Sequence, residues 1–88
     1  MKIREGLMLR EIAGSWIVVP IGERVVEFNA MIILSKSGAQ LWERLQSGAD
    51  EDDLVQLLKS KYDVDDFTAK ADVQEFISSV SERGLFVE

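Results

Sequence analysis

The hydrophobic pattern of the chain changes its period near residue 35. Before this point, short apolar runs rich in β-branched residues are separated by glycines, as is typical of strands. After it, apolar residues recur every three or four positions, as is typical of amphipathic helices. The pattern therefore predicts strands followed by helices, the order of an α+β domain.

The first third of the chain predicts a three-stranded antiparallel meander. Two apolar runs, Leu7 to Ile12 and Ser15 to Pro20, are separated by Ala13-Gly14, a dipeptide suited to a tight hairpin turn. Gly22-Glu23 then offers a second reversal, and Val25 to Leu34 supplies the third strand.

Three helices are expected to follow the meander. Ser35 or Ser37 caps the first helix, which ends at Gly48, and Asp50 and Asp65 begin the second and third. Since three strands with one apolar face need covering, residues 1–88 are predicted to form a single α+β domain. The apolar faces of the second and third helices consist of Leu54, Val55, Leu57, Leu58 and Tyr62, and of Ala69, Val73, Phe76, Ile77 and Val80.

Of the two tryptophans, Trp42 in the first helix is expected in the core, whereas Trp16 on a strand is expected to be half exposed.

The amino-acid composition excludes most kinds of enzymatic catalysis. The chain has neither histidine nor cysteine, so disulfides, the usual zinc ligands and imidazole acid–base catalysis are all excluded. Ser35 and Ser37 have no base of suitable pKa to activate them as nucleophiles. We therefore expect a protein that is not an enzyme and that binds no metal and no organic cofactor.

Charge and hydropathy exclude two classes of partner. The formal net charge is −6 and the third helix is mostly acidic, which disfavours nucleic acid even for a helix-in-groove fold. No apolar run approaches the roughly 20 residues that span a bilayer, and the first residues are charged rather than a signal peptide. No membrane partner is expected, and the predicted location is the cytoplasm.

The third strand raises the functional question, because residues 30–34, AMIIL, contain no charge. An uncharged edge strand is a liability that proteins usually cover. One explanation is that the third helix, or the tail after it, covers this edge. The other is that an extended peptide completes the sheet there.

The runs FNAMIILSKSGAQLWERLQSGADEDDLVQLL and YDVDDFTAKADVQEFISSVSERGLF resemble the PqqD-like family, named for a protein of pyrroloquinoline quinone biosynthesis. The resemblance is carried by the order and spacing of an apolar strand, a Ser-Gly-Ala helix start, a tryptophan, a glycine before an acidic helix, and the pattern DVQEFI with a later GL. It covers nearly the whole chain.

This resemblance implies a recognition element for a ribosomally synthesised and post-translationally modified peptide (RiPP), with a winged-helix-like fold. Such a domain acts as a peptide chaperone without catalysis: it binds the leader segment of the precursor as an extra strand and presents the rest to a modifying enzyme, often a radical SAM protein. The alternative is a protein–protein interaction or winged-helix regulatory domain unrelated to peptide maturation.

Carried over by position, the resemblance implies a peptide-binding site between the third strand and the third helix. Its expected residues are Phe28, Asn29, Ala30, Met31, Ile32, Ile33 and Leu34 on the strand, and Val73, Phe76, Ile77 and Val80 on the helix.

Overall fold

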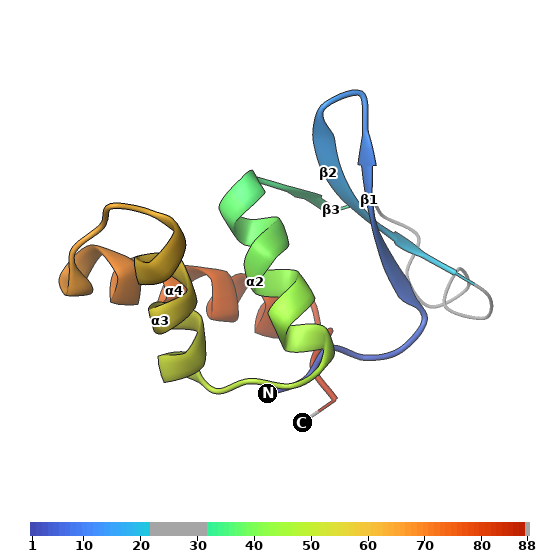
Figure 1. Cartoon of the computed structure of the whole chain (residues 1–88). Coiled ribbons are helices and arrows are strands. Elements are labelled where there is room, and N and C mark those ends of the chain that lie inside the picture. Colours follow the sequence, from blue (N-terminus) through green and yellow to red (C-terminus); the bar gives the residue numbers. More distant parts are fainter. Residues whose placement is uncertain (22–31, 88) are drawn as a thin grey trace.

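The computed structural model describes residues 1–21 and 32–87, and its elements follow the predicted order of strands and then helices (Figure 1). The predicted reversal at Gly22-Glu23, and residues 25–31 of the predicted third strand, lie outside the described residues. The elements are β1 (Leu7–Ile12), β2 (Ser15–Pro20), β3 (Ile32–Leu34), α2 (Lys36–Gln46), α3 (Glu51–Lys61) and α4 (Asp66–Glu82).

The three strands form an antiparallel sheet in the order β1-β2-β3, as the meander predicts. Ala13 and Gly14 connect β1 to β2 with φ values of 52° and 83°, the positive pair that a two-residue type I′ hairpin turn requires. The predicted turn is therefore confirmed, and it fixes the register in which Ile12 faces Ser15.

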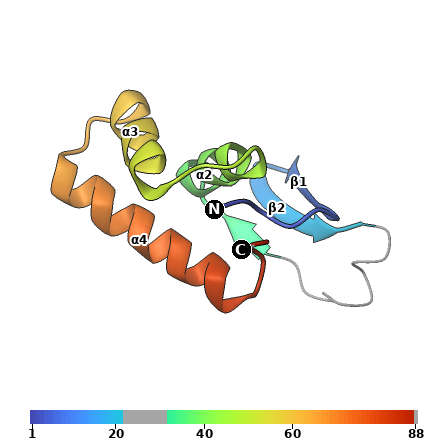
Figure 2. The same ribbon diagram turned by 90° about the horizontal axis from the view of Figure 1, so that it is seen from below.

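The register gives the sheet a buried and an exposed face. Val18 and Ile32 are paired on the buried face, with exposed fractions of 0% and 7%. Ile17 and Ile33 form the next pair, whose side chains project to the opposite face because alternate residues point to opposite sides. The helices lie together to one side of the hairpin (Figure 2), and α2 contacts both β1 and β3.

The core beneath the sheet is centred on Trp42 of α2, which is fully buried, as expected from the sequence. Leu45 and Leu54 are also fully buried in the same cluster. The indole Nε1 of Trp42 has no hydrogen-bond partner, an arrangement that typically costs about 1–3 kcal/mol.

Each helix begins at a side-chain cap. The backbone N–H of Gly38 donates to Ser35 Oγ at 3.1 Å, so Ser35 rather than Ser37 is the cap of α2. Asp50 and Asp53 form a reciprocal capping box at the start of α3. Asp65 accepts from the Thr68 N–H at 2.7 Å and caps α4, and this backbone hydrogen bond lowers the pKa of Asp65. The predicted acidic caps are confirmed.

Helix α4 packs against α3, and an ion pair links the first turn of α4 to α3. Asp66 lies 3.3 Å from both Lys70 Nζ and Lys59 Nζ, which belong to α4 and α3. Hydrogen bonds from Lys70, and then from Lys59, hold the pKa of Asp66 below its usual value. Such exposed pairs contribute little to stability, so the buried apolar stripe of α4 is its main attachment.

The two ends of the chain pair with each other. Ile3 and Phe86 form an antiparallel bridge, flanked by hydrogen bonds from Arg4 N to Leu85 O at 2.8 Å and from Val87 N to Lys2 O at 2.9 Å. The termini consequently lie close together beneath α2 (Figure 1). Among the described helices, none is long and apolar enough to cross a membrane.

Candidate functional site

The outer edge of β3 is the part of the sheet on which a site could form. Within residues 1–21 and 32–87, β3 pairs with β2 and with no other strand. The sequence offered the chain's tail as one cover for this edge, but Phe86 pairs with Ile3 instead. The described tail therefore adds no strand to the sheet at this edge. We call the side of Ile32–Leu34 that faces away from β2 the open edge.

One hydrogen bond decides which backbone groups of β2 face each neighbour. Ile21 N donates to Gly6 O at 2.8 Å, which makes Gly6 and Ile21 a hydrogen-bonded pair beyond the end of the β1–β2 ladder. Hydrogen-bonded and non-hydrogen-bonded pairs alternate in an antiparallel ladder. The backbone of Ile17 therefore also faces β1, while those of Trp16 and Val18 face β3.

This alternation leaves one described residue of β3 with its backbone on the open edge. Ile32 is paired with Val18 and Leu34 with Trp16, so their N–H and C=O groups face β2. Ile33 lies between them, and its N–H and C=O therefore point away from β2. Its side chain is also 73% exposed, on the outer face of the sheet.

Helix α4 carries apolar side chains that remain partly accessible. Phe76 and Ile77 are half-buried and pack against the edge of the core, so part of each side chain is accessible. Val73 and Val80 are buried, with exposed fractions of 0% and 4%. Of the four positions expected on the helix, Phe76 and Ile77 have accessible surface for a guest, whereas Val73 and Val80 belong to the core.

Gly38, at the start of α2, lies between β3 and α4. A Cβ atom built at Gly38 would lie 3.6 Å from both Leu34 Cβ and Phe76 Cε1, and 3.2 Å from Ser35 Oγ. The two 3.6 Å distances are ordinary van der Waals contacts, so the space for a Cβ is tight only toward the hydroxyl of the Ser35 cap. Sequence reasoning used Gly38 only as part of the family pattern. The signal for its role was a glycine in the first turn of a helix, where the residue has a poor intrinsic propensity.

A cleft of about 340 Å³, which we call the α4 cleft, lies between the start of α2 and α4. Its apolar lining includes Leu41, Leu58 and Phe76, and Asp72 and Glu75 of α4 add carboxylates. Ser35, which directly follows β3, also lines this cleft, so the cleft reaches the end of that strand.

The expected site residues thus have different positions in the structure. Ile32 is a core residue, Ile33 projects outward and Leu34 is half-buried next to Phe76. The remaining strand positions, Phe28, Asn29, Ala30 and Met31, lie outside the described residues.

The chemistry of this surface is that of strand addition. The open edge presents backbone donors and acceptors, and α4 presents apolar side chains, the two features that an extended peptide requires. The described residues contain no group of three or more acidic, histidine or cysteine side chains arranged to hold a metal ion.

Comparison with solved structures identifies the fold. A structure described as TbiB1 in complex with the TbiA(beta) leader peptide aligns with a TM-score of 0.75 at 20% identity, over 97% of this chain and 93% of the other. A lasso peptide synthetase B1 complexed with the leader peptide aligns with a TM-score of 0.73 at 21% identity, over 96% and 93%. At this level of identity, the likeness establishes a shared fold.

Sequence comparison identifies the family, whereas the structural comparison establishes only the fold. No curated protein sequence matches this chain. Residues 15–85, however, match the family described as Coenzyme PQQ synthesis protein D (PqqD). The matched range begins with β2 and ends at the buried Leu85, so it includes the open edge, α4 and the whole helical layer. The chain is therefore a member of the PqqD family, as its sequence resemblance predicted.

Proposed function

We propose that this protein binds the leader segment of a ribosomally synthesised precursor peptide as an added strand on β3, and presents the rest of the precursor to a separate modifying enzyme. The observation that carries the proposal is the open edge at Ile33, which faces away from β2 and carries an exposed apolar side chain. Membership of the PqqD family supports the same function.

In this proposal the leader lies about 4.8 Å from β3, at the ordinary spacing of neighbouring strands. Its backbone exchanges hydrogen bonds with Ile33. Guest side chains on one face contact Leu34, Phe76 and Ile77, and those on the other face lie beside the Ile33 side chain. Val73 and Val80 position α4 without touching the guest.

The proposed site also includes four residues that precede Ile32 in the sequence. Phe28, Asn29, Ala30 and Met31 are assigned to it by family resemblance. A longer guest would pair along these positions as well, which would give the leader more main-chain bonds than the described part of β3 offers.

Both similar structures are described as complexes with a leader peptide, which supports the choice of guest. The chemistry of modification is assigned to the partner enzyme, for which we propose a radical SAM protein. The present chain contributes binding alone, in keeping with its lack of histidine and cysteine.

Calorimetric titration with a synthetic leader peptide from the precursor encoded beside the gene tests the proposal. We expect one-to-one binding, and we expect amide signals of Ile33 and Phe76 to shift in an NMR titration. A scrambled peptide of the same composition is the control. Equal binding of both peptides, or shifts confined to residues away from β3 and α4, would contradict the proposal.

A further inference from the structure

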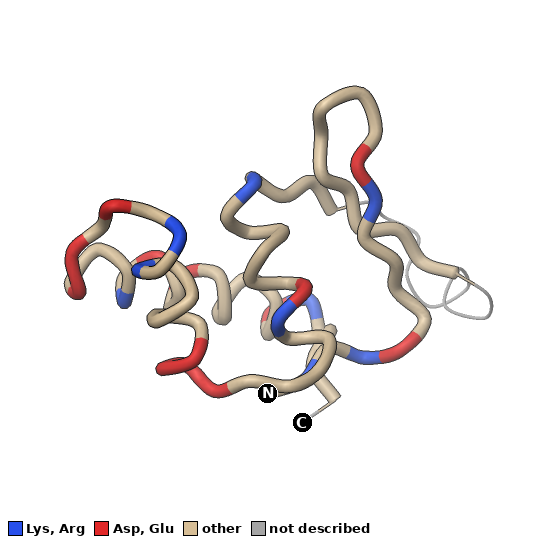
Figure 3. The backbone as a smooth tube through the Cα atoms, viewed as in Figure 1, with Lys and Arg blue, Asp and Glu red and all other residues tan. Residues whose placement is uncertain are grey.

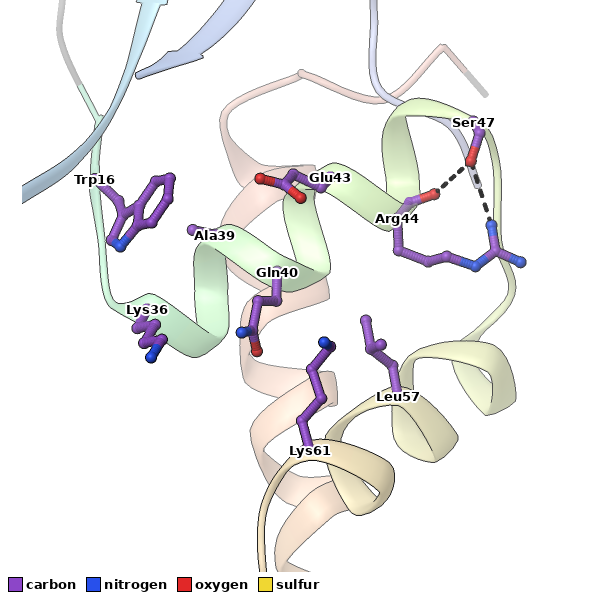
Figure 4. Close-up of a pocket in the computed structure, with 9 residues that line it drawn as sticks. All are labelled: Trp16, Lys36, Ala39, Gln40, Glu43, Arg44, Ser47, Leu57 and Lys61. Atoms are coloured by element: carbon purple, nitrogen blue, oxygen red, sulfur yellow. Dashed lines mark hydrogen bonds between the residues drawn. The ribbon is translucent and has the colours of Figure 1, made fainter. Parts of the chain in front are cut away.

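A second cleft is lined by a different face of α2 from the one that lines the α4 cleft. Figure 4 shows the residues that line this second cleft. It has a volume of about 520 Å³ and is bounded by β2, α2 and the end of α3. The α2 residues that line it include Lys36, Gln40 and Arg44, whereas Ser37 and Leu41 line the α4 cleft. We call it the cationic cleft. Because α2 separates the two clefts, both can be occupied at once.

The charge of this cleft is opposite to that of the chain. Lys36, Arg44 and Lys61 line it together with one carboxylate, Glu43, although the whole chain has 10 basic and 16 acidic residues. The acidic first turn of α3 (Figure 3) borders the cleft through Asp53 but contributes none of its lining residues. The cleft is thus a local site of positive charge on an acidic protein.

The lysines at this site are not neutralised within the described part of the chain. Lys36 and Lys61 are exposed and neither forms an ion pair there. Arg44 differs, because it lies 3.6 Å from Asp53 and also donates to the Gly48 carbonyl. Within residues 1–21 and 32–87, two of the three cations therefore have no carboxylate partner.

The neutral groups of the cleft add hydrogen-bond donors and an apolar surface. Gln40 Oε1 accepts from Tyr62 Oη at 2.9 Å, so the amide NH₂ of Gln40 remains as a donor. The half-buried Trp16 faces α2 across the opening (Figure 4), and its indole N–H is a donor as well. Leu57, also half-buried, adds apolar surface from α3.

We propose that the cationic cleft binds an acidic segment of a partner protein, in which carboxylates flank an apolar side chain. The carboxylates contact Lys36 and Lys61 and accept hydrogen bonds from Gln40 and Trp16, while the apolar side chain packs between Trp16 and Leu57. This assignment rests on the proposed function: we assign the acidic segment to the modifying enzyme. The domain would then bind the enzyme through the cationic cleft while it binds the leader at the open edge.

The first experiment uses a defined probe, acetyl-Glu-Glu-Leu-Glu-Glu-amide, with the glutamine peptide acetyl-Gln-Gln-Leu-Gln-Gln-amide as its neutral match. We expect the acidic peptide to shift the NMR signals of the Trp16 indole N–H and the Gln40 side-chain amide, and the neutral peptide not to. Added salt should weaken the interaction, because exposed charges are screened.

The matched variants are Lys36→Gln with Lys61→Gln, and Lys59→Gln with Lys70→Gln. Both pairs remove two positive charges, but the second pair lies at Asp66, away from the cleft. We expect the first pair to weaken binding of the acidic peptide roughly fivefold and the second to leave it unchanged. Equal weakening by both pairs would show a general charge effect and overturn the proposal.

The same variants identify the partner. The modifying enzyme encoded beside the gene should bind the Lys36→Gln, Lys61→Gln variant roughly fivefold more weakly than the parent, and excess acidic peptide should compete with it. Unchanged enzyme binding, or tighter binding of an eight-nucleotide single-stranded DNA than of the acidic peptide, would overturn the proposal.

Leader titration of the same variant separates the two sites. A leader that fails to bind the parent protein refutes the proposed function, while the peptide mapping tests the cleft independently.

Discussion

The two edges of the sheet differ in how they are protected. β1 is six residues long and carries Arg10 and Glu11, both exposed. β3, as described, has three residues and no charge, and Ile33 is mostly exposed. Charged residues on an edge discourage other strands from pairing with it. The comparison shows that β1 has an ordinary protected edge, while the protection is missing where we propose that a guest binds.

The backbone alternation makes this comparison testable residue by residue. On β3 the N–H of Ile32 faces β2 and that of Ile33 faces outward, and on β1 the outward N–H groups include that of Glu11. Proline removes one N–H at a chosen position, so it distinguishes groups that hold the sheet from groups that are offered to a guest.

The largest effect is expected for Ile32→Pro. This change deletes a ladder donor to β2 and replaces a buried side chain, so we expect a loss of roughly 2–5 kcal/mol in the free energy of unfolding. Urea unfolding followed by circular dichroism measures it. A variant as stable as the parent would show that the N–H of Ile32, rather than that of Ile33, faces away from β2.

For Ile33→Pro we expect the opposite combination, a folded protein that has lost leader binding. The donor that faces the guest is gone and the ring obstructs the approaching strand, so affinity should fall at least about tenfold. Glu11→Pro removes the equivalent outward donor from β1 and is the matched control. If both variants bind the leader like the parent, β3 is not the docking edge.

The α4 side of the open edge is tested by Ile77→Asp, with Val73→Asp as its core counterpart. Ile77 is half-buried, and a carboxylate there should weaken leader binding about tenfold while the helix persists. Val73 is fully buried, so its replacement should unfold the domain. Circular dichroism and calorimetry separate the two results. Loss of the fold in both variants would place Ile77 in the core.

A smaller effect is expected at the junction between β3 and α2. Ser35→Ala removes the cap that accepts from Gly38 N, which should cost about 1 kcal/mol of stability. Ser35→Asp should restore most of it, and Ser37→Ala should have little effect because Ser37 is not the cap. Thermal melts of the three variants check this. A larger loss in Ser37→Ala than in Ser35→Ala would contradict the assignment.

Much of the fold was predictable because its signals are local. The hairpin turn at Ala13-Gly14, the Asp50 and Asp65 caps and the burial of Trp42 follow from turn chemistry, capping and helical spacing. Each of these signals involves residues within a few positions of one another.

The candidate site was less predictable, because it depends on contacts between distant residues. The stripe on α4 does not distinguish Val73 from Ile77, since burial depends on how the helix rotates against α3. The choice between Ile32 and its neighbours depends on the register with β2. Likewise, no local pattern indicates that Phe86 pairs with Ile3 rather than with β3.

That pairing has a consequence for how the domain can be joined to other proteins. Because Ile3 pairs with Phe86, the two ends of the described chain lie side by side. The Ala13-Gly14 turn lies at the other end of the molecule, at the tip of the β1–β2 hairpin (Figure 1). A domain of this shape is suited to insertion into a surface loop of a host protein, because its entry and exit points are adjacent. A circular permutant with joined ends, opened between Ala13 and Gly14, would keep the pairing of β2 with both β1 and β3 and leave the open edge unchanged.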